Sequence, residues 1–188
     1  MIPLVKKAQK GSQEAFIQLI ENNKQDMYKI AISILNNDAD AADAIQDTIL
    51  SCYENLCSLR YPKYFKTWMT RILINHCNRI LREHQKFIPI DSYDVKSSRL
   101  PSETCSFQEP NFFTQNEDFF ELLNQMDEAY RLILLLYYLE EFNIKEISQL
   151  LDLNENTVKS RLSRGRKIFQ KMYLKKHPTY QYQTKEVM

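Results

Sequence analysis

Glycine is almost missing from the 188-residue sequence, which has only Gly11 and Gly165. Nucleotide-binding loops cradle phosphate groups with clustered glycines, so this scarcity excludes loops of that kind. It also disfavours folds built from many β-hairpins, because their tight turns depend on glycine. The sequence therefore favours a helical fold.

Frequent prolines and long hydrophobic runs are missing as well. The six prolines leave proline-free stretches at 4–61, 63–88 and 111–177, and these can form helices because proline breaks a helix interior. No run reaches the ~18 apolar residues that cross a membrane, and the first seven residues lack the hydrophobic stretch of a signal peptide. We expect no membrane-spanning segment.

Paired cysteine motifs are the last absence. None of the four cysteines belongs to a CxxC pair, and a chain of this length can bury a hydrophobic core without disulfides. We interpret them as reduced thiols of a cytoplasmic protein. They are Cys52, Cys57, Cys77 and Cys105.

Acidic and basic residues nearly balance, at 24 and 25, but they are separated along the chain. Residues 30–59 contain five acids and no Lys or Arg, whereas residues 61–82 contain five bases and no acid. Residues 156–176 contain eight bases and again no acid. Such segregation indicates surfaces that meet charged partners.

The first 85 residues are predicted to form helices. Ser12 is expected to cap one helix, Asn36-Asn37 to end it, and Asp38 to cap the next. Pro62 marks a further boundary, and a third long helix is expected from about Lys63 to Glu83. The inward-facing side chains predicted for the first two helices are Phe16, Leu19, Ile20, Met27, Ile30 and Ile34, and then Ile45, Ile49, Cys52 and Leu56.

Residues 86–116 differ in composition, with three of the six prolines, scattered serines and no helical period. We interpret them as a linker, and residues 117–176 as a second helical block. The predicted fold class is all-α: two small helical domains, 1–85 and 117–176, joined by a flexible linker, with a tail at 177–188. The C-terminal domain is expected to be a helix-turn-helix.

The helix-turn-helix prediction rests on residues 144–162. Ile147, Leu150 and Leu151 give the first helix an apolar face, Leu153 fills the turn, and Asn154 is a good N-cap for the next helix. That helix has an apolar row at Val158, Leu162, Gly165, Phe169 and Met172. Ser160, Ser163, Arg164 and Lys167 lie roughly opposite Val158. Such a face suits the DNA major groove. The alternative is a solvated surface helix, although exposed helices usually mix charges of both signs.

The predicted third helix carries a polar face. Its members are spaced by 4, 3 and 4 residues and are Arg71, Asn75, Asn78 and Arg82. Four aromatic residues lie just before this face in the sequence: Tyr61, Tyr64, Phe65 and Trp68. Amides, guanidinium groups and aromatic rings together are what unpaired nucleic acid binds. The alternative is that the aromatic residues, Trp68 above all, belong to the core.

An acidic face is predicted on the second helix, where Asp40, Asp43 and Asp47 align beside Gln46. Acids near a helix N-terminus and ordinary solvation are the simple explanations. A carboxylate pair for acid–base catalysis is another, but no His, Lys or Ser joins the acids in a recognisable constellation. A docking patch for a basic protein surface fits better.

Three motifs follow one another along the chain. Residues 40–47 read DAADAIQD, residues 65–75 read FKTWMTRILIN and are followed by Leu81-Arg82, and residues 157–166 read TVKSRLSRGR. In this order they resemble the signatures DAEDAVQE, F..WL.RIA.N with LR, and TVKSRL.RAR of the extracytoplasmic-function (ECF) class of bacterial sigma factors. The resemblance covers nearly the whole chain. Ala42 stands where the first signature has Glu, and Asp152 stands where the turn of a helix-turn-helix often has Gly.

The resemblance implies a protein that catalyses nothing, binds core RNA polymerase, recognises the −35 and −10 promoter elements and promotes DNA melting. Domain 1–85 would correspond to sigma domain 2 and domain 117–176 to sigma domain 4. The implied −35-binding residues are Thr157, Lys159, Ser160, Arg161, Ser163, Arg164 and Lys167. The implied −10-binding residues are Arg60, Lys63, Trp68, Arg71, Asn75, Asn78 and Arg82. The implied polymerase-binding residues are Asp40, Asp43, Gln46 and Asp47.

The same resemblance implies the partners. They are the β′ clamp helices and β flap of core RNA polymerase, promoter DNA, and an anti-sigma factor of the kind that is often anchored in a membrane. No cofactor, metal or small-molecule substrate is expected. Two other interpretations stay open: a helix-turn-helix regulator that works without polymerase, and an enzyme with Cys77 as a nucleophile beside His76. Neighbours on a helix point ~100° apart, which argues against direct pairing of those two residues.

Overall fold

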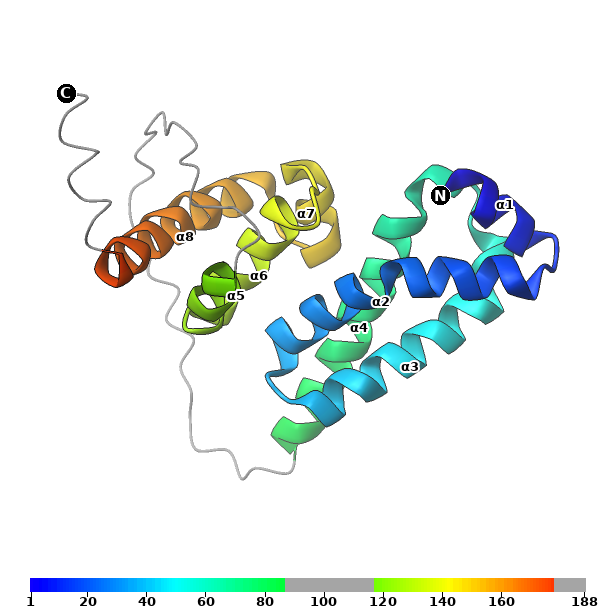
Figure 1. Ribbon diagram of the computed structural model, residues 1–188, viewed down its shortest axis with the longest axis horizontal. Helices are drawn as coiled ribbons and strands as arrows, with labels where there is room; N and C mark the ends of the chain where they lie inside the picture. The colour runs from blue at the N-terminus through cyan, green and yellow to red at the C-terminus, as the bar shows by residue number, and fades with distance from the viewer. Residues whose placement is uncertain (87–116, 178–188) are drawn as a thin grey trace. The chain divides into compact units, whose positions relative to one another are not determined.

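The computed structural model describes residues 1–86 and 117–177, and within these ranges every regular element is a helix (Figure 1). The predicted linker and tail, Cys105 included, fall almost wholly outside the described residues. Two compact units are present. One contains residues 1–86, with residues 148–153 grouped with it, and the other contains residues 117–147 and 154–177. The prediction of an all-α fold is confirmed.

The first unit begins with two helices of unequal length, α1 (Ile2–Gln9) and α2 (Gln13–Leu35). The short helix α1 was not anticipated. Gly11 allows the sharp turn between the two helices, because its φ of 93° lies in the region that favours glycine. The Ser12 hydroxyl accepts the Ala15 N–H at 3.2 Å, so the predicted N-cap is confirmed. All six predicted core residues of α2 are buried.

Helix α3 (Asp38–Asn55) follows a turn at Asn36, whose φ of 49° is left-handed. The N-cap is Asn37, whose side-chain oxygen accepts the Asp40 N–H, and not Asp38 as predicted. The predicted buried row was also wrong in part, because Ile45 and Ile49 are only half-buried. The buried row is instead Ala41, Ala44, Thr48 and Cys52. Small side chains on this row let the backbone of α3 approach α2 and α4 closely.

Two single-turn 3₁₀ helices, η1 (Leu56–Ser58) and η2 (Pro62–Tyr64), connect α3 to α4 (Phe65–Lys86). Pro62 does mark a boundary, but the long helix begins two residues later than predicted. Helix α4 packs against both α2 and α3, and Figure 1 shows the three as the long blue, cyan and green helices. Phe65, Met69, Leu73 and Cys77 recur every four residues and are almost completely buried. The core therefore lies along one side of α4.

The second part of the chain contains α5 (Glu117–Asn124), α6 (Glu128–Tyr138), α7 (Ile144–Leu151) and α8 (Glu155–Lys176). Helices α6 and α8 pack closely at Gly165, where an added Cβ would lie 3.3 Å from the Leu134 side chain. Phe119 of α5 meets Phe169 of α8 with ring centroids 5.0 Å apart. Val158, Leu162, Gly165 and Phe169 are buried and Met172 is half-buried, so the predicted inner row of α8 is confirmed in its main part.

The turn between α7 and α8 has the expected helix-turn-helix construction. Asp152 adopts a left-handed φ of 52°, which glycine adopts easily and aspartate tolerates. The Ser148 hydroxyl donates to the Leu153 carbonyl at 2.6 Å, and the Leu153 N–H donates back to the Ser148 carbonyl at 3.0 Å. The Asn154 side chain accepts the Thr157 N–H at 2.7 Å and caps α8 as predicted.

None of the helices in the described ranges is both long enough and apolar enough to cross a membrane.

Candidate nucleic-acid and polymerase interfaces

The polar face predicted on α4 lies outside the core. Arg71, Asn75, Asn78 and Arg82 are all exposed, whereas the opposite side of the helix carries the buried row that begins at Phe65. The Arg82 Nε donates to the Asn78 carbonyl at 3.0 Å, which holds the guanidinium group along the helix. This face therefore presents two amides and two cations outside the buried core of the first unit.

The four aromatic residues near the start of α4 divide between surface and core. Phe65 is completely buried, Trp68 is half-buried, and the Tyr61 and Tyr64 side chains are 58% and 46% exposed. The two tyrosine rings form an edge-to-face pair with centroids 6.3 Å apart. The Lys63 ammonium group lies 4.7 Å from the centre of the Tyr64 ring. Exposed rings beside cations can stack on unpaired bases and attract their phosphates.

The acidic face of α3 is exposed only in part. Asp43 and Gln46 are exposed, but the Asp47 carboxylate pairs with Arg79 of α4. The Asp40 carboxylate lies 3.7 Å from the His84 Nε2, also on α4. The Arg79 guanidinium group therefore offsets part of the negative charge, and spacing along α3 alone could not reveal these contacts between helices. Asp43 and Gln46 remain the most accessible members of the predicted set.

On α8 the predicted DNA-binding side chains flank the buried row. Lys159 and Lys167 are exposed, and the other five are half-buried. The Ser160 hydroxyl donates to the Thr157 carbonyl at 3.0 Å, so its proton is used within the helix while its oxygen can still accept. The five half-buried members are Thr157, Ser160, Arg161, Ser163 and Arg164.

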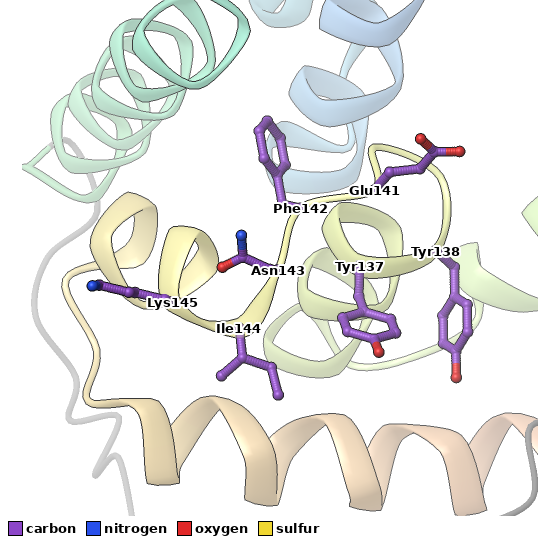
Figure 2. Close-up of a pocket in the computed structure, with 7 residues that line it drawn as sticks. All are labelled: Tyr137, Tyr138, Glu141, Phe142, Asn143, Ile144 and Lys145. Carbon is purple, nitrogen blue, oxygen red and sulfur yellow. The ribbon is translucent and has the colours of Figure 1, made fainter. Parts of the chain in front are cut away.

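Arg166, which is not among the predicted DNA-binding residues, joins α8 to α6. Its guanidinium carbon lies 5.2 Å and 5.4 Å from the ring centres of Tyr137 and Tyr138, within cation–π range. The same tyrosines line a cavity of about 650 Å³ at the end of α6, and Figure 2 shows their rings on the side of α6 that faces α8, with Glu141 pointing away. Arg166 therefore stabilises the packing of α8 on α6.

Two family models match the chain in the predicted order. Residues 19–87 match Sigma-70 region 2, and residues 116–168 match Sigma-70, region 4. Together these matches span more than half of the chain. The chain is also 27% identical over 162 residues to the RNA polymerase sigma factor SigV of Bacillus subtilis (strain 168), covering 86% of this chain and 93% of SigV. It is 26% identical over 179 residues to the ECF RNA polymerase sigma factor SigW of the same strain, covering 89% and 93%. The chain belongs to the ECF class of RNA polymerase sigma factors.

Solved structures agree with the fold of this sigma factor. The sigma factor RpoE from Bartonella quintana, solved with the anti-sigma factor NepR, has a TM-score of 0.61 at 21% identity, covering 84% of this chain and 96% of that one. CnrH, solved with the cytosolic domain of CnrY, has a TM-score of 0.60 at 19% identity, covering 92% and 96%. At these identities the likeness shows the fold.

The sigma factor therefore acts in promoter recognition and transcription initiation with RNA polymerase. A helix-turn-helix regulator that works without polymerase would account for the region 4 match only. The region 2 match, which contains nearly all of α2–α4, leaves that interpretation without support.

The structure also bears on the enzyme interpretation. Cys77 is completely buried, and burial raises the pKa of its thiol to about 12, so the nucleophilic thiolate is scarce at neutral pH. His76 does not face Cys77, because its Nε2 lies 3.0 Å from the Ser51 hydroxyl and its Nδ1 lies 3.9 Å from Asp47. Sequence spacing does not reveal this Ser–His–Asp grouping, because its members come from two helices, α3 and α4.

The Ser–His–Asp grouping lacks what a hydrolase needs. Asp47 is already paired with Arg79, and its 3.9 Å separation from the imidazole is too long for the hydrogen bond that orients a catalytic histidine. Ser51 lies within α3, where backbone N–H groups bond to carbonyls four residues earlier and cannot form an oxyanion hole. The grouping therefore serves the packing of α3 against α4.

Proposed function

We propose that the two parts of this sigma factor contact different states of one promoter. Residues 1–85 dock on the polymerase clamp and read and hold the melted −10 element, and residues 117–176 read the −35 element as duplex DNA. Residues 86–116 link them, and no role is assigned to 177–188. The observation that carries this proposal is the outward polar face of α4, next to an exposed tyrosine pair, on a unit separate from the basic helix α8.

The −10 contacts are proposed for the α4 face and the segment before it. Unstacked bases need aromatic surfaces, hydrogen-bond donors and cations, and these lie together at the start and along the outer side of α4. The residues with this role are Arg60, Lys63, Trp68, Arg71, Asn75, Asn78 and Arg82.

The −35 contacts are proposed for the first four turns of α8, because a helix fits the major groove and Arg or Lys can bond guanine edges there. Thr157, Lys159, Ser160, Arg161, Ser163, Arg164 and Lys167 form this set. The polymerase contact is proposed for Asp40, Asp43, Gln46 and Asp47, on the β′ clamp helices. The β flap is the proposed polymerase partner of the C-terminal domain.

Two variants test whether the two surfaces act on separate steps. With purified holoenzyme, Asn75→Ala is expected to lower the permanganate reactivity of −10 thymines and leave the −35 footprint intact. Arg164→Glu is expected to weaken the −35 footprint and runoff transcription. The matched controls are Asn22→Ala on the exposed side of α2 and Lys175→Glu, ~16 Å further along α8. Footprints and transcripts that stay unchanged in Arg164→Glu would remove its assigned role.

We also propose that an anti-sigma factor, often membrane-anchored in this family, holds the protein inactive. The support is that the similar RpoE structure contains a sigma factor with a bound anti-sigma factor. The similar CnrH structure also contains a bound protein, the cytosolic domain of CnrY. Isolation of the native complex from membrane and soluble fractions tests this. A chain that copurifies with core polymerase alone under every growth condition contradicts it.

The protein is proposed to have no catalytic activity of its own and to act in the cytoplasm, where polymerase and chromosome are found. Unchanged transcription by Ser51→Ala and Cys77→Ser holoenzymes is the expected result. Loss of transcription in a variant that still folds and binds core polymerase would point to chemistry at that residue.

A further inference from the structure

Helix α1 lies before the region 2 match, which begins at residue 19, and its last residue contacts the segment that leads into α4. The Gln9 Nε2 lies 2.8 Å from the Leu59 carbonyl oxygen and 3.0 Å from the Leu56 carbonyl oxygen. Because both neighbours are carbonyl oxygens, the amide nitrogen must face them, and its two N–H bonds supply one donor to each. The side chain is half-buried at this point.

These two hydrogen bonds fix the beginning of the segment that joins α3 to α4. Leu56 is the first residue of η1 and Leu59 directly follows this helix, and the Leu56 carbonyl also accepts the Leu59 N–H at 3.2 Å. In the opposite direction, the Cys57 thiol donates to the Gln9 carbonyl at 3.7 Å. Arg60, directly after Leu59, is exposed, and so are the residues that follow it at the entrance to α4: Tyr61, Lys63 and Tyr64.

Helix α1 is itself held firmly enough to serve as an anchor. Val5 is completely buried, and α1 packs against α2 and against both η1 and η2. The Ser12 N–H donates to the Lys7 carbonyl at 3.2 Å, which ties the end of α1 to the start of α2. Gln9 therefore connects the packed helix α1 to the short segment that leads into α4.

We propose that Gln9 is a positioning residue for the −10 contact, which acts by holding residues 56–59 so that the Arg60–Tyr64 side chains are in place before DNA opens. The inference rests on the proposed function, in which that segment meets unstacked bases. A binding segment fixed in advance loses less conformational freedom when it binds, so its affinity for the opened strand is higher.

Three substitutions at this position separate positioning from simple structural support. Gln9→Glu keeps the shape but places carboxylate oxygens against two carbonyl oxygens, whereas Gln9→Lys keeps donors and has no acceptor. Gln9→Ala removes the two hydrogen bonds without adding repulsion, and it takes the place of Gln9→Glu in the assay if that variant does not fold. The matched control is Gln18→Glu, the same chemical change at an exposed position of α2.

The measurements use holoenzyme on a promoter fragment: permanganate reactivity of −10 thymines, the −35 footprint, and the ranking of promoters that differ in one −10 base. Gln9→Glu is expected to lower opening about tenfold, or ~1.4 kcal/mol, and to flatten the ranking. Gln9→Lys is expected to stay within about twofold of the unsubstituted protein. The −35 footprint should not change in either.

Two results would overturn the positioning role: Gln9→Glu opening DNA as well as Gln18→Glu, or Gln9→Lys and Gln9→Glu being equally defective. Tyr61→Ala in the same assay keeps this proposal distinct from the proposed function. If Tyr61→Ala lowers opening and Gln9→Glu does not, only the role of Gln9 fails. If Tyr61→Ala, Lys63→Ala and Gln9→Glu all leave opening unchanged, the assignment of the segment to the −10 element fails as well.

Discussion

Removal of two exposed cations from α8 gives a quantitative test of DNA binding. Lys159 and Lys167 lie eight residues apart, ~12 Å along the helix, and both side chains are exposed. Their truncation to alanine leaves the buried row from Val158 to Phe169 unchanged. If each lysine neutralises one phosphate, the slope of log K against log salt should fall by about 0.9 for each, or about 1.8 for the pair.

This slope change has a measurable consequence. The double variant Lys159→Ala/Lys167→Ala should bind a promoter fragment more weakly than the unsubstituted holoenzyme, and its deficit should shrink about 12-fold from about 50 to about 200 mM salt. Fluorescence anisotropy across this range measures both quantities. The control is Lys10→Ala/Lys24→Ala, with the same charge change at exposed positions of the first unit. A salt slope that is equal in the two double variants would refute the placement of α8 on DNA.

Three further predictions concern docking, capping and cysteine chemistry. Asp43→Lys should weaken binding to core polymerase in a competition assay about tenfold more than Glu54→Lys, a charge reversal at another exposed position ~16 Å further along α3. Equal effects of the two variants would show that the acidic face does not dock on the polymerase. Asn154→Ala should lower the free energy of unfolding by about 1 kcal/mol and speed hydrogen exchange in the first turn of α8, because it removes the N-cap. Asn154→Asp keeps the cap and should have neither effect, and unchanged exchange in Asn154→Ala would contradict the cap. Burial raises the pKa of the Cys52 and Cys77 thiols from 9.0 to about 12, so iodoacetamide at pH 8 should label exposed Cys57 and spare these two until denaturant is added, as peptide mapping can check. Because burial raises the pKa of both thiols in the folded state, the free energy of unfolding should decline as pH rises from 9.0 towards about 12. Rapid labelling of Cys77 in the native protein would contradict its burial.

Features encoded by a few neighbouring residues could be predicted from the sequence. Ser12 and Asn154 were identified as N-caps because a cap needs only a short polar side chain before an apolar row. Asp152 stands where the turn of a helix-turn-helix often has Gly, and only the structure shows that its backbone is left-handed, with a φ of 52°. The polar face of α4 followed from helical spacing alone.

Features that depend on contacts between helices could not be predicted. The buried row of α3 consists mainly of small residues, and hydrophobicity favoured Ile45 and Ile49 over Ala41 and Ala44. The pairing of Asp47 with Arg79 joins residues 32 positions apart, and the contact of Gln9 with Leu59 joins residues 50 positions apart. The exposure of Tyr64 beside a completely buried Phe65 likewise depends on how α4 enters the core.

We propose that this protein directs polymerase to promoters through two DNA-binding surfaces. The most direct measurement is runoff transcription by purified core polymerase on a library of genomic fragments, with and without the protein. We expect the protein to copurify with core polymerase and to yield discrete transcripts whose start sites share upstream −35 and −10 sequences. If the protein fails to bind core polymerase and the transcripts are the same in its presence and absence, it does not direct polymerase to promoters.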